Sequence, residues 1–273
     1  MRFLLEIVRG IKRILPDFTL AVRLNMDDFV AGGLNLEESV EKVGSSLKKA
    51  KPTAELEAQR IEELKKYEYM AYQQGYQYIA GIDEVGRGPL AGPVAAAAVI
   101  LPKEFCLAGV NDSKVLSEKK RQSLVGKIKQ EALAWAVGVV SPGYIDRENI
   151  LNASREAMRM AIKALRPVPD YLLIDAMKIP DIKINQLSII KGDALSISIA
   201  CASIIAKVER DEMMKVYDAL YPNYGFARHK GYATREHMLA LQQYGPCPIH
   251  RISFEPIKSS WGGSYEHQLH LFE

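Results

Sequence analysis

The sequence is poor in the features that mark secreted, zinc-binding and membrane-spanning proteins. It has only three cysteines in 273 residues, and none forms a Cys-x-x-Cys pair, which argues against a disulfide framework and a structural zinc site. The apolar stretch at the amino terminus is broken by Glu6, so it is too short for a signal-peptide core or a membrane span. We therefore expect a soluble protein of the reducing cytoplasm that does not bind membranes.

Internal repeats and low-complexity tracts are also missing, and the five histidines show no spacing typical of metal ligands. Apolar residues make up 48% of the chain and charged residues 25%, as in an ordinary globular protein. The net charge is only +3, but residues 71–258 hold a basic excess, with 24 Lys and Arg against 19 Asp and Glu. This excess fits a phosphate-binding surface around a metal site and equally a mildly basic, solvated surface.

Composition divides the chain into three parts. Residues 1–70 are expected to form a mainly helical amino-terminal extension of unassigned role, ending in a Glu- and Lys-rich helix from about residue 53 to 74. Residues 71–258 carry the pattern of the main domain. Residues 259–273 form a tail that we expect to be flexible.

The main domain has the pattern of an α/β fold. Apolar runs bounded by Gly or Pro predict strands over residues 76–83, 94–101, 132–140, 172–175 and 187–193. Helical spacing of apolar residues predicts a helix after the third strand and a long helix over 195–220. Strands in succession, followed by strands alternating with helices, predict a mixed central sheet flanked by helices.

Acidic residues end three of these strands. Asp83 and Glu84 close the first strand, Asp175 the fourth and Asp193 the fifth. Singly, each has an ordinary explanation: an exposed Asp-Glu pair, a turn aspartate or a helix N-cap. Together at one edge of a sheet they predict a site for divalent cations, which prefer oxygen ligands and can promote phosphoryl transfer in pairs. Because neighbours on a strand point to opposite faces, both acids can reach one site only if the chain leaves the strand there, and we expect Gly86, Gly88 and Pro89 to supply that exit.

Other residues of the main domain suit a nucleic-acid substrate. The glycines of Gly86-Arg87-Gly88 let the backbone approach a ligand closely, and its amides can donate hydrogen bonds. The remaining candidates are two basic side chains and a hydroxyl for phosphates, and an aromatic ring for a sugar or base: Lys114, Lys207, Ser113 and Tyr232. A capping role for the segment with Ser113, a solvated Lys207 and a core Tyr232 are the alternatives.

The motifs of residues 78–258 resemble those of bacterial ribonuclease HII, the type 2 ribonuclease H family. The matching segments are Gly81-Ile82-Asp83-Glu84-Val85-Gly86-Arg87-Gly88-Pro89-Leu90-Ala91-Gly92-Pro93, Asn111-Asp112-Ser113-Lys114, Leu173-Ile174-Asp175, Lys191-Gly192-Asp193, Ala202-Ser203-Ile204-Ile205-Ala206-Lys207-Val208, His229-Lys230-Gly231-Tyr232-Ala233-Thr234 and Pro248-Ile249-His250-Arg251-Ile252-Ser253-Phe254-Glu255-Pro256. The resemblance implies a ribonuclease H-like fold for the catalytic domain. It also implies an endonuclease that cuts the RNA strand of RNA/DNA hybrids and incises 5′ of single ribonucleotides in duplex DNA, leaving 3′-hydroxyl and 5′-phosphate ends.

The same resemblance assigns roles to individual residues. Four acids would bind two Mg²⁺ or Mn²⁺ ions: Asp83, Glu84, Asp175 and Asp193. The loop of Gly86, Arg87 and Gly88 would read the 2′-hydroxyl, and Tyr232 would stack on the sugar beyond the cut. Backbone phosphates would be held by Ser113, Lys114 and Lys207.

Three other functions compete with this interpretation. The first is a type HIII ribonuclease H, which also begins its motif with Asp-Glu. The second is a hybrid-binding module without catalysis, against which the intact set of four acids argues. The third is another two-metal nuclease such as an exonuclease, against which the Gly86-Arg87-Gly88 loop argues because it suits ribose selection.

The end of the tail is similar to the short peptides by which bacterial replication proteins dock on the sliding clamp. Its residues Gln268, Leu269, Leu271 and Phe272 place apolar anchors on an otherwise polar terminus, as a peptide-in-pocket contact requires. A tail that folds back on the body is the alternative. We expect docking on the sliding clamp.

Overall fold

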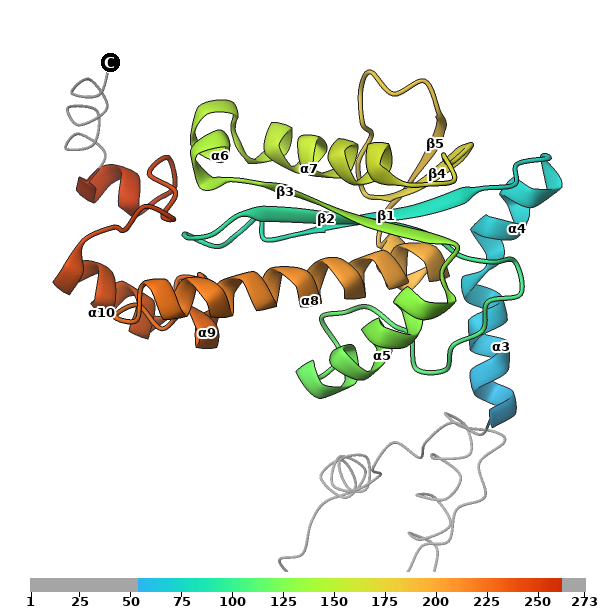
Figure 1. Ribbon diagram of the computed structural model, residues 1–273, viewed down its shortest axis with the longest axis horizontal. Coiled ribbons are helices and arrows are strands. Elements are labelled where there is room, and N and C mark those ends of the chain that lie inside the picture. Colours follow the sequence, from blue (N-terminus) through green and yellow to red (C-terminus); the bar gives the residue numbers. More distant parts are fainter. Residues whose placement is uncertain (1–53, 262–273) are drawn as a thin grey trace, which may run out of the picture. The chain divides into compact units, whose positions relative to one another are not determined.

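The computed structural model describes residues 54–261, which form one compact unit (Figure 1). The expectations for residues 1–53 and for the tail beyond residue 261 lie outside this range. The helices and strands, in chain order, are α3 (Ala54–Leu64), α4 (Lys66–Gln73), β1 (Ile79–Val85), β2 (Val94–Ile100), α5 (Glu118–Glu131), β3 (Ala134–Val140), α6 (Pro142–Glu148), α7 (Ile150–Ala164), β4 (Tyr171–Asp175), β5 (Asn185–Ile189), the 3-10 helix η2 (Gly192–Ala194), α8 (Ile197–Leu220), α9 (Phe226–His229) and α10 (Arg235–Tyr244).

The five strands form one sheet in the order β3-β2-β1-β4-β5. The pairs β1–β2 and β2–β3 are antiparallel, whereas β1–β4 and β4–β5 are parallel. The expected mixed sheet is therefore confirmed. The parallel pairing of β1 and β4 places their carboxyl ends side by side. The predicted site lies at this end of the sheet.

Helices cover both faces of the sheet, with α7 on one side and α8 and α5 on the other (Figure 1). The sequence VAAAAVI of β2 is buried along its whole length, because a strand covered on both faces exposes neither set of side chains. Helix α8 packs so close to β1 that a Cβ atom on Gly81 would lie 2.1 Å from the backbone carbon of Ser198. The alanines and this glycine bring α8 close to the strand that carries the first acids.

Two consecutive helices, α3 and α4, replace the single helix expected over residues 53–74. They separate at Lys65, whose amide donates to the carbonyl of Glu62 three residues earlier instead of four. Ile61 and Leu64 of α3 join the buried cluster under α8, and Ala71 of α4 joins a smaller cluster near β4. The boundary expected near residue 70 thus falls inside the compact unit.

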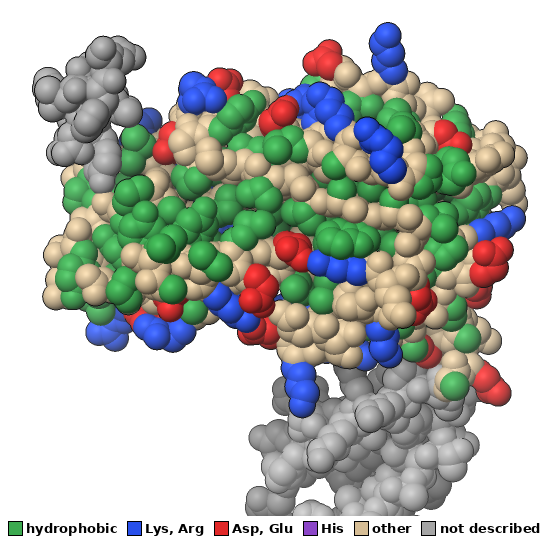
Figure 2. Space-filling view, in the orientation of Figure 1, with side chains coloured by type: hydrophobic (Ala, Val, Ile, Leu, Met, Phe, Trp, Pro, Cys, Tyr) green, Lys and Arg blue, Asp and Glu red, His purple; other side chains and the backbone are tan. Residues whose placement is uncertain are grey.

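The edge strand β3 lies between α7 and α8, where Figure 2 shows apolar side chains gathered in a band. Trp135 is 40% exposed there, and the ammonium of Lys129 lies 4.1 Å from the centre of its ring. Within residues 54–261, no helix combines the length and apolar character needed to span a membrane.

Candidate active site

Asp83 and Asp175 lie on neighbouring parallel strands at the same level. The last paired residues of β1 and β4 are Ile82 and Ile174, and the two aspartates follow them by one residue on each strand. Parallel neighbours lie about 4.8 Å apart, so the register alone brings these two carboxylates together. Asp83 is buried, with 4% of its surface exposed.

Glu84 follows Asp83 on β1 without the break in the strand that the sequence pattern predicted. Strand β1 continues through Asp83 and Glu84 to Val85, and Glu84 still pairs with Ala96 of β2. The strand ends two residues later than expected, and the chain leaves it at Gly86, as predicted, where the φ of 92° is open to glycine but costly for other residues. The backbone amide of Glu84 donates to Asp83 Oδ1 at 2.7 Å.

Asp193 is not at the end of a strand, and the strand predicted over residues 187–193 is wrong in this detail. Strand β5 ends at Ile189, and Asp193 lies in η2, the 3-10 turn before α8. The turn is tied to β4 because the amide of Gly192 donates to Asp175 Oδ1 at 2.7 Å. This bond brings Asp193 to the same end of the sheet as Asp175.

The charges of the acids act on one another. Burial raises the pKa of Asp83 well above its usual range, and the charges of Glu84 and Asp175 raise it further. Burial also raises the pKa of Glu84, against the opposing charge of Arg87. The pKa of Asp175 is raised by burial and by the charge of Asp193, although the hydrogen bond from Gly192 opposes this. The charges of Glu84 and Asp175 thus act on Asp83, and the charge of Asp193 acts on Asp175, at this end of the sheet.

Two of the four carboxylates are bonded to cations of the chain. Lys114 Nζ donates to Asp193 Oδ2 at 3.0 Å, and Arg87 Nη1 donates to Glu84 Oε1 at 3.2 Å. In residues 54–261 no group of three or more His, Cys, Asp and Glu side chains is arranged as a ready metal site. Asp193 and Glu84 thus each have one oxygen turned to a basic side chain of the protein.

The chemistry of the acids nevertheless fits a hard cation. Glu84 Oε2 is buried and has no hydrogen-bond partner among the described residues. A buried carboxylate oxygen without a partner costs free energy, and like charges in a dry site repel one another. A divalent cation would satisfy both, because it prefers oxygen ligands and offsets several negative charges at once.

The segment Gly86-Arg87-Gly88, called the glycine loop below, lies beside Tyr232. A Cβ atom on Gly88 would lie 3.7 Å from Tyr232 Cε1, so the ring is in contact distance of the loop. Tyr232 is 45% exposed, and its amide donates to the carbonyl of His229 at 3.0 Å. The interpretation of Tyr232 as a buried core residue is therefore wrong, and its ring is free to contact a ligand.

Two of the predicted phosphate-binding residues, Ser113 and Lys207, have their partners on α8. Ser113 is buried, and its hydroxyl shares a 2.8 Å hydrogen bond with that of Ser203. Ser203 in turn bonds to Asp83, which lowers the pKa of that carboxyl against the effect of burial. Lys207, one turn further along α8, donates to Asp211 Oδ1 at 2.7 Å. Ser203 stands four residues before Lys207 on α8 and was not among the residues predicted for the site.

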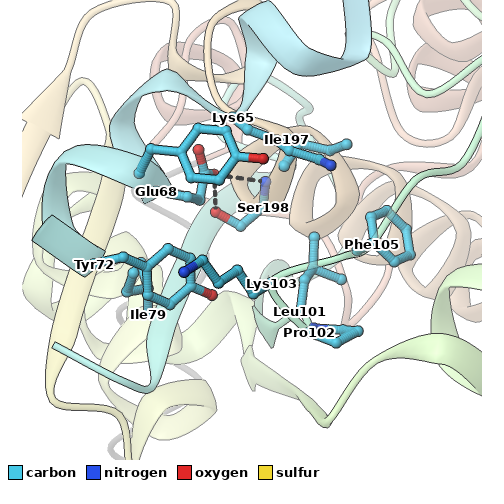
Figure 3. A pocket seen from close by; sticks show the side chains of 11 residues that line it. Lys65, Glu68, Tyr72, Ile79, Leu101, Pro102, Lys103, Phe105, Ile197 and Ser198 are labelled. Carbon is cyan, nitrogen blue, oxygen red and sulfur yellow. Dashed lines mark hydrogen bonds between the residues drawn. The ribbon is translucent and has the colours of Figure 1, made fainter. Parts of the chain in front are cut away.

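Glu68 on α4 is a second residue that the sequence analysis missed. It is buried, and its Oε1 accepts hydrogen bonds from the hydroxyls of Ser196 and Ser198 and from the Ser198 amide (Figure 3). It thus caps the first turn of α8, the helix that follows Asp193. Burial raises the pKa of Glu68. The pocket next to it, rimmed by Lys65 and Lys103, has room for about one water molecule.

Comparison with known proteins accounts for this arrangement. The family model described as Ribonuclease HII matches residues 80–257. The chain belongs to the ribonuclease HII family. It is 59% identical over 218 residues to the ribonuclease HII of Syntrophomonas wolfei, which covers 80% of this chain and 86% of that protein. It is 50% identical over 254 residues to the ribonuclease HII of Enterococcus faecalis, with 93% and 98% coverage.

Solved structures agree with the family and the fold. The ribonuclease H2 of Pyrococcus horikoshii OT3 is 25% identical, with a TM-score of 0.58 over 67% of this chain and 96% of that one. The ribonuclease HII of Archaeoglobus fulgidus, solved in a complex with PCNA, is 26% identical, with a TM-score of 0.55 over 66% and 96%. The expected ribonuclease H-like fold is confirmed, and the family match favours type HII over the type HIII alternative.

Membership of the ribonuclease HII family establishes the general activity. The protein is a nuclease of the ribonuclease H type that acts on RNA/DNA hybrids and depends on divalent metal ions. The predicted clamp-docking residues Gln268, Leu269, Leu271 and Phe272 lie outside the described residues.

Proposed function

We propose that this ribonuclease HII incises duplex DNA on the 5′ side of single embedded ribonucleotides, in addition to cutting RNA in RNA/DNA hybrids. The products carry 3′-hydroxyl and 5′-phosphate ends. The enzyme works in cytoplasmic repair linked to replication. The proposal is supported by the register that places Asp83 and Asp175 on neighbouring strands, by the coupling of their charges to Glu84 and Asp193, and by Tyr232 against the glycine loop.

Asp83, Glu84, Asp175 and Asp193 would hold two divalent cations, Mg²⁺ or Mn²⁺. Bound there, the cations would supply an activated water and stabilise the departing 3′ oxygen. The unpartnered Glu84 Oε2 and the mutual repulsion of the acids support this assignment. Lys114 already lies against Asp193, where its ammonium can meet a backbone phosphate as well as the acid.

The residues around the acids distinguish ribose from deoxyribose. The amides of Arg87 and Gly88 donate to the 2′-hydroxyl, which only a ribonucleotide carries. The ring of Tyr232, half-exposed beside Gly88, packs on the neighbouring sugar. Ser113 and Lys207 complete the track for the phosphate backbone from the α8 side of the sheet.

A single substrate tests this proposal. A DNA duplex with one embedded ribonucleotide is incubated with the enzyme, with and without Mg²⁺ or Mn²⁺, and the cut is mapped on a sequencing gel. We expect one metal-dependent cut 5′ of the ribonucleotide and none in an all-DNA duplex of the same sequence. Digestion of the all-DNA duplex from its ends would instead indicate an exonuclease, and binding without cleavage would indicate a non-catalytic module.

We propose further that the tail docks on the replication sliding clamp through Gln268, Leu269, Leu271 and Phe272. The apolar anchors of the sequence support this, and so does the complex of the Archaeoglobus fulgidus relative with PCNA. Deletion of residues 266–273 is expected to abolish clamp pull-down while cleavage of a free oligonucleotide stays at the level of the full chain. Clamp binding by the truncated protein would contradict the assignment.

A further inference from the structure

Arg251 is completely buried behind the glycine loop, and its guanidinium is used entirely on backbone carbonyls. Nη2 donates to Gly86 O at 2.6 Å and to Gly92 O at 2.8 Å, Nη1 donates to Arg87 O at 2.9 Å, and Nε donates to Gly92 O at 3.0 Å. Burial and the charge of Arg210 lower the pKa of Arg251 to about 9, so it remains protonated at neutral pH. A single side chain therefore holds both carbonyls at the centre of the loop.

The direction of these carbonyls decides the direction of the amides that follow them. In a trans peptide the carbonyl and the next N–H point in opposite directions. Because the carbonyls of Gly86 and Arg87 point at Arg251, the amides of Arg87 and Gly88 point away from it. In residues 54–261 neither amide donates to a backbone carbonyl, and Gly88 is the residue in contact distance of Tyr232. The two donors are thus left for a ligand.

A second buried arginine, Arg210, holds the segment that follows the glycine loop. Arg210 donates from Nε to Pro93 O at 2.9 Å, from Nη2 to Ala91 O at 3.2 Å and from Nη1 to Lys230 O at 3.1 Å. It binds neither Gly86 O nor Arg87 O. Its contacts tie residues 91–93 to the turn before Tyr232. This division of contacts allows the two arginines to be tested separately.

Only a guanidinium can make the Arg251 contacts. Its planar fork presents five N–H donors in fixed directions, whereas the ammonium of lysine is a compact charge with three donors. A lysine at this position keeps the positive charge but cannot reach all three carbonyls at once. The variant Arg251→Lys therefore changes the contacts that hold the loop and keeps the positive charge behind it.

We propose that Arg251 is a positioning residue for ribose selection, because it fixes the carbonyls of Gly86 and Arg87 and so aims the amides of Arg87 and Gly88 at the 2′-hydroxyl. The inference rests on the proposed function of this loop. Arg251 itself does not touch the substrate. Its effect is expected in the preference for ribose over deoxyribose rather than in the overall affinity for duplexes.

The test is the binding of two duplexes without divalent cations, one all-DNA and one with a single ribonucleotide. For Arg251→Lys we expect the preference for the ribonucleotide duplex to fall about tenfold, as the loss of one well-aligned hydrogen bond implies. Affinity for the all-DNA duplex should change by less than about twofold, because the charge is kept. Arg166→Lys is the control for an arginine-to-lysine change as such, since Arg166 is exposed and donates to the carbonyls of Lys163 and Leu165 and not to the loop.

The outcomes distinguish the role of Arg251 from ribose recognition by the loop. A folded Arg251→Lys protein with the wild-type preference would overturn the positioning role. Equal affinity of the wild-type enzyme for both duplexes would refute the proposed ribose recognition and the inference with it. If the variant does not fold, hydrogen exchange of the wild-type chain tests where the amides are aimed. The amides of Arg87 and Gly88 must become protected by the ribonucleotide duplex and not by the all-DNA duplex, and the absence of this difference would overturn the inference.

Discussion

The buried acids at the ends of β1 and β4 and the buried bases behind the glycine loop satisfy their polar atoms in different ways. Among the acids, Glu84 Oε2 has no partner and neighbouring charges repel one another. The bases are Arg210, Arg251 and the imidazoles of His229, His237 and His250, and each bonds to at least one backbone group. An unpartnered oxygen thus remains among the acids proposed to bind metal, whereas the buried side chains behind the glycine loop have backbone partners that hold the loop in shape.

The largest expected effect is that of Asp83→Asn, which should lower cleavage by at least roughly a hundredfold. The variant deletes a charge that a cation needs while it keeps the shape of the side chain. Because Asp83 is buried among like charges, the melting temperature should stay the same or rise. Cleavage rate and thermal unfolding are measured together, with Asp181→Asn in an exposed loop as the control. Near-normal cleavage by Asp83→Asn would reject the assignment of the acids.

Arg210→Met should lower the stability of the fold, whereas Asp83→Asn should not. The change leaves the carbonyls of Pro93, Ala91 and Lys230 buried without their donor, which we expect to destabilise the fold by about 3 kcal/mol. Urea unfolding measures the loss. A variant as stable as the wild type would break the contrast between the two regions, because the carbonyl bonds of Arg210 would then contribute nothing net.

A smaller loss of stability is expected when the pH is lowered. Burial lowers the pKa of His237 to about 4, and burial with the charge of His237 lowers that of His250 to about 3, from an ordinary value of 6.5. Between pH 6.5 and 4 the unfolded chain therefore binds protons that the folded chain does not, so stability falls as pH falls. Above pH 7 both states are neutral at these histidines, and they add no pH dependence.

Chemical unfolding at a series of pH values tests this. The double variant His237→Gln, His250→Gln should lose less of its own stability between pH 6.5 and 4 than the wild type does. An equal loss in both proteins would assign the acid sensitivity to other groups. The two rings share a 3.0 Å contact between their Nε2 atoms, so the double variant avoids leaving one ring without its partner.

The sequence pattern predicted most of the fold because the pattern is local. The apolar run at β2 and the acid at the end of β4 were placed correctly, since buried strands are continuous apolar stretches. The break at Lys65 was missed because a Glu- and Lys-rich stretch has the same helical pattern on either side of it. Asp193 was placed on a strand because the apolar run of β5 continues one residue beyond Ile189 before the chain turns.

The residues of the candidate site were found in unequal measure. The acids and Tyr232 were predicted because motifs in sequence order pointed to them. Arg251 and Ser203 received no role, although both stand inside matching motifs. A buried arginine or serine looks in sequence like any exposed one, and its partners are carbonyls or hydroxyls far along the chain.

The amino-acid sequence by itself predicted the five strands, the long helix α8, the four candidate acids and the glycine loop that follows the first pair. These depend on side-chain periodicity and on backbone freedom at single positions, which are local properties. Tertiary structure alone decided that Asp83 and Asp175 become neighbours through the β1–β4 register, and that Arg251 turns the loop carbonyls inward. Both depend on contacts between residues about 90 and 165 positions apart, and such contacts form only when the whole sheet has assembled.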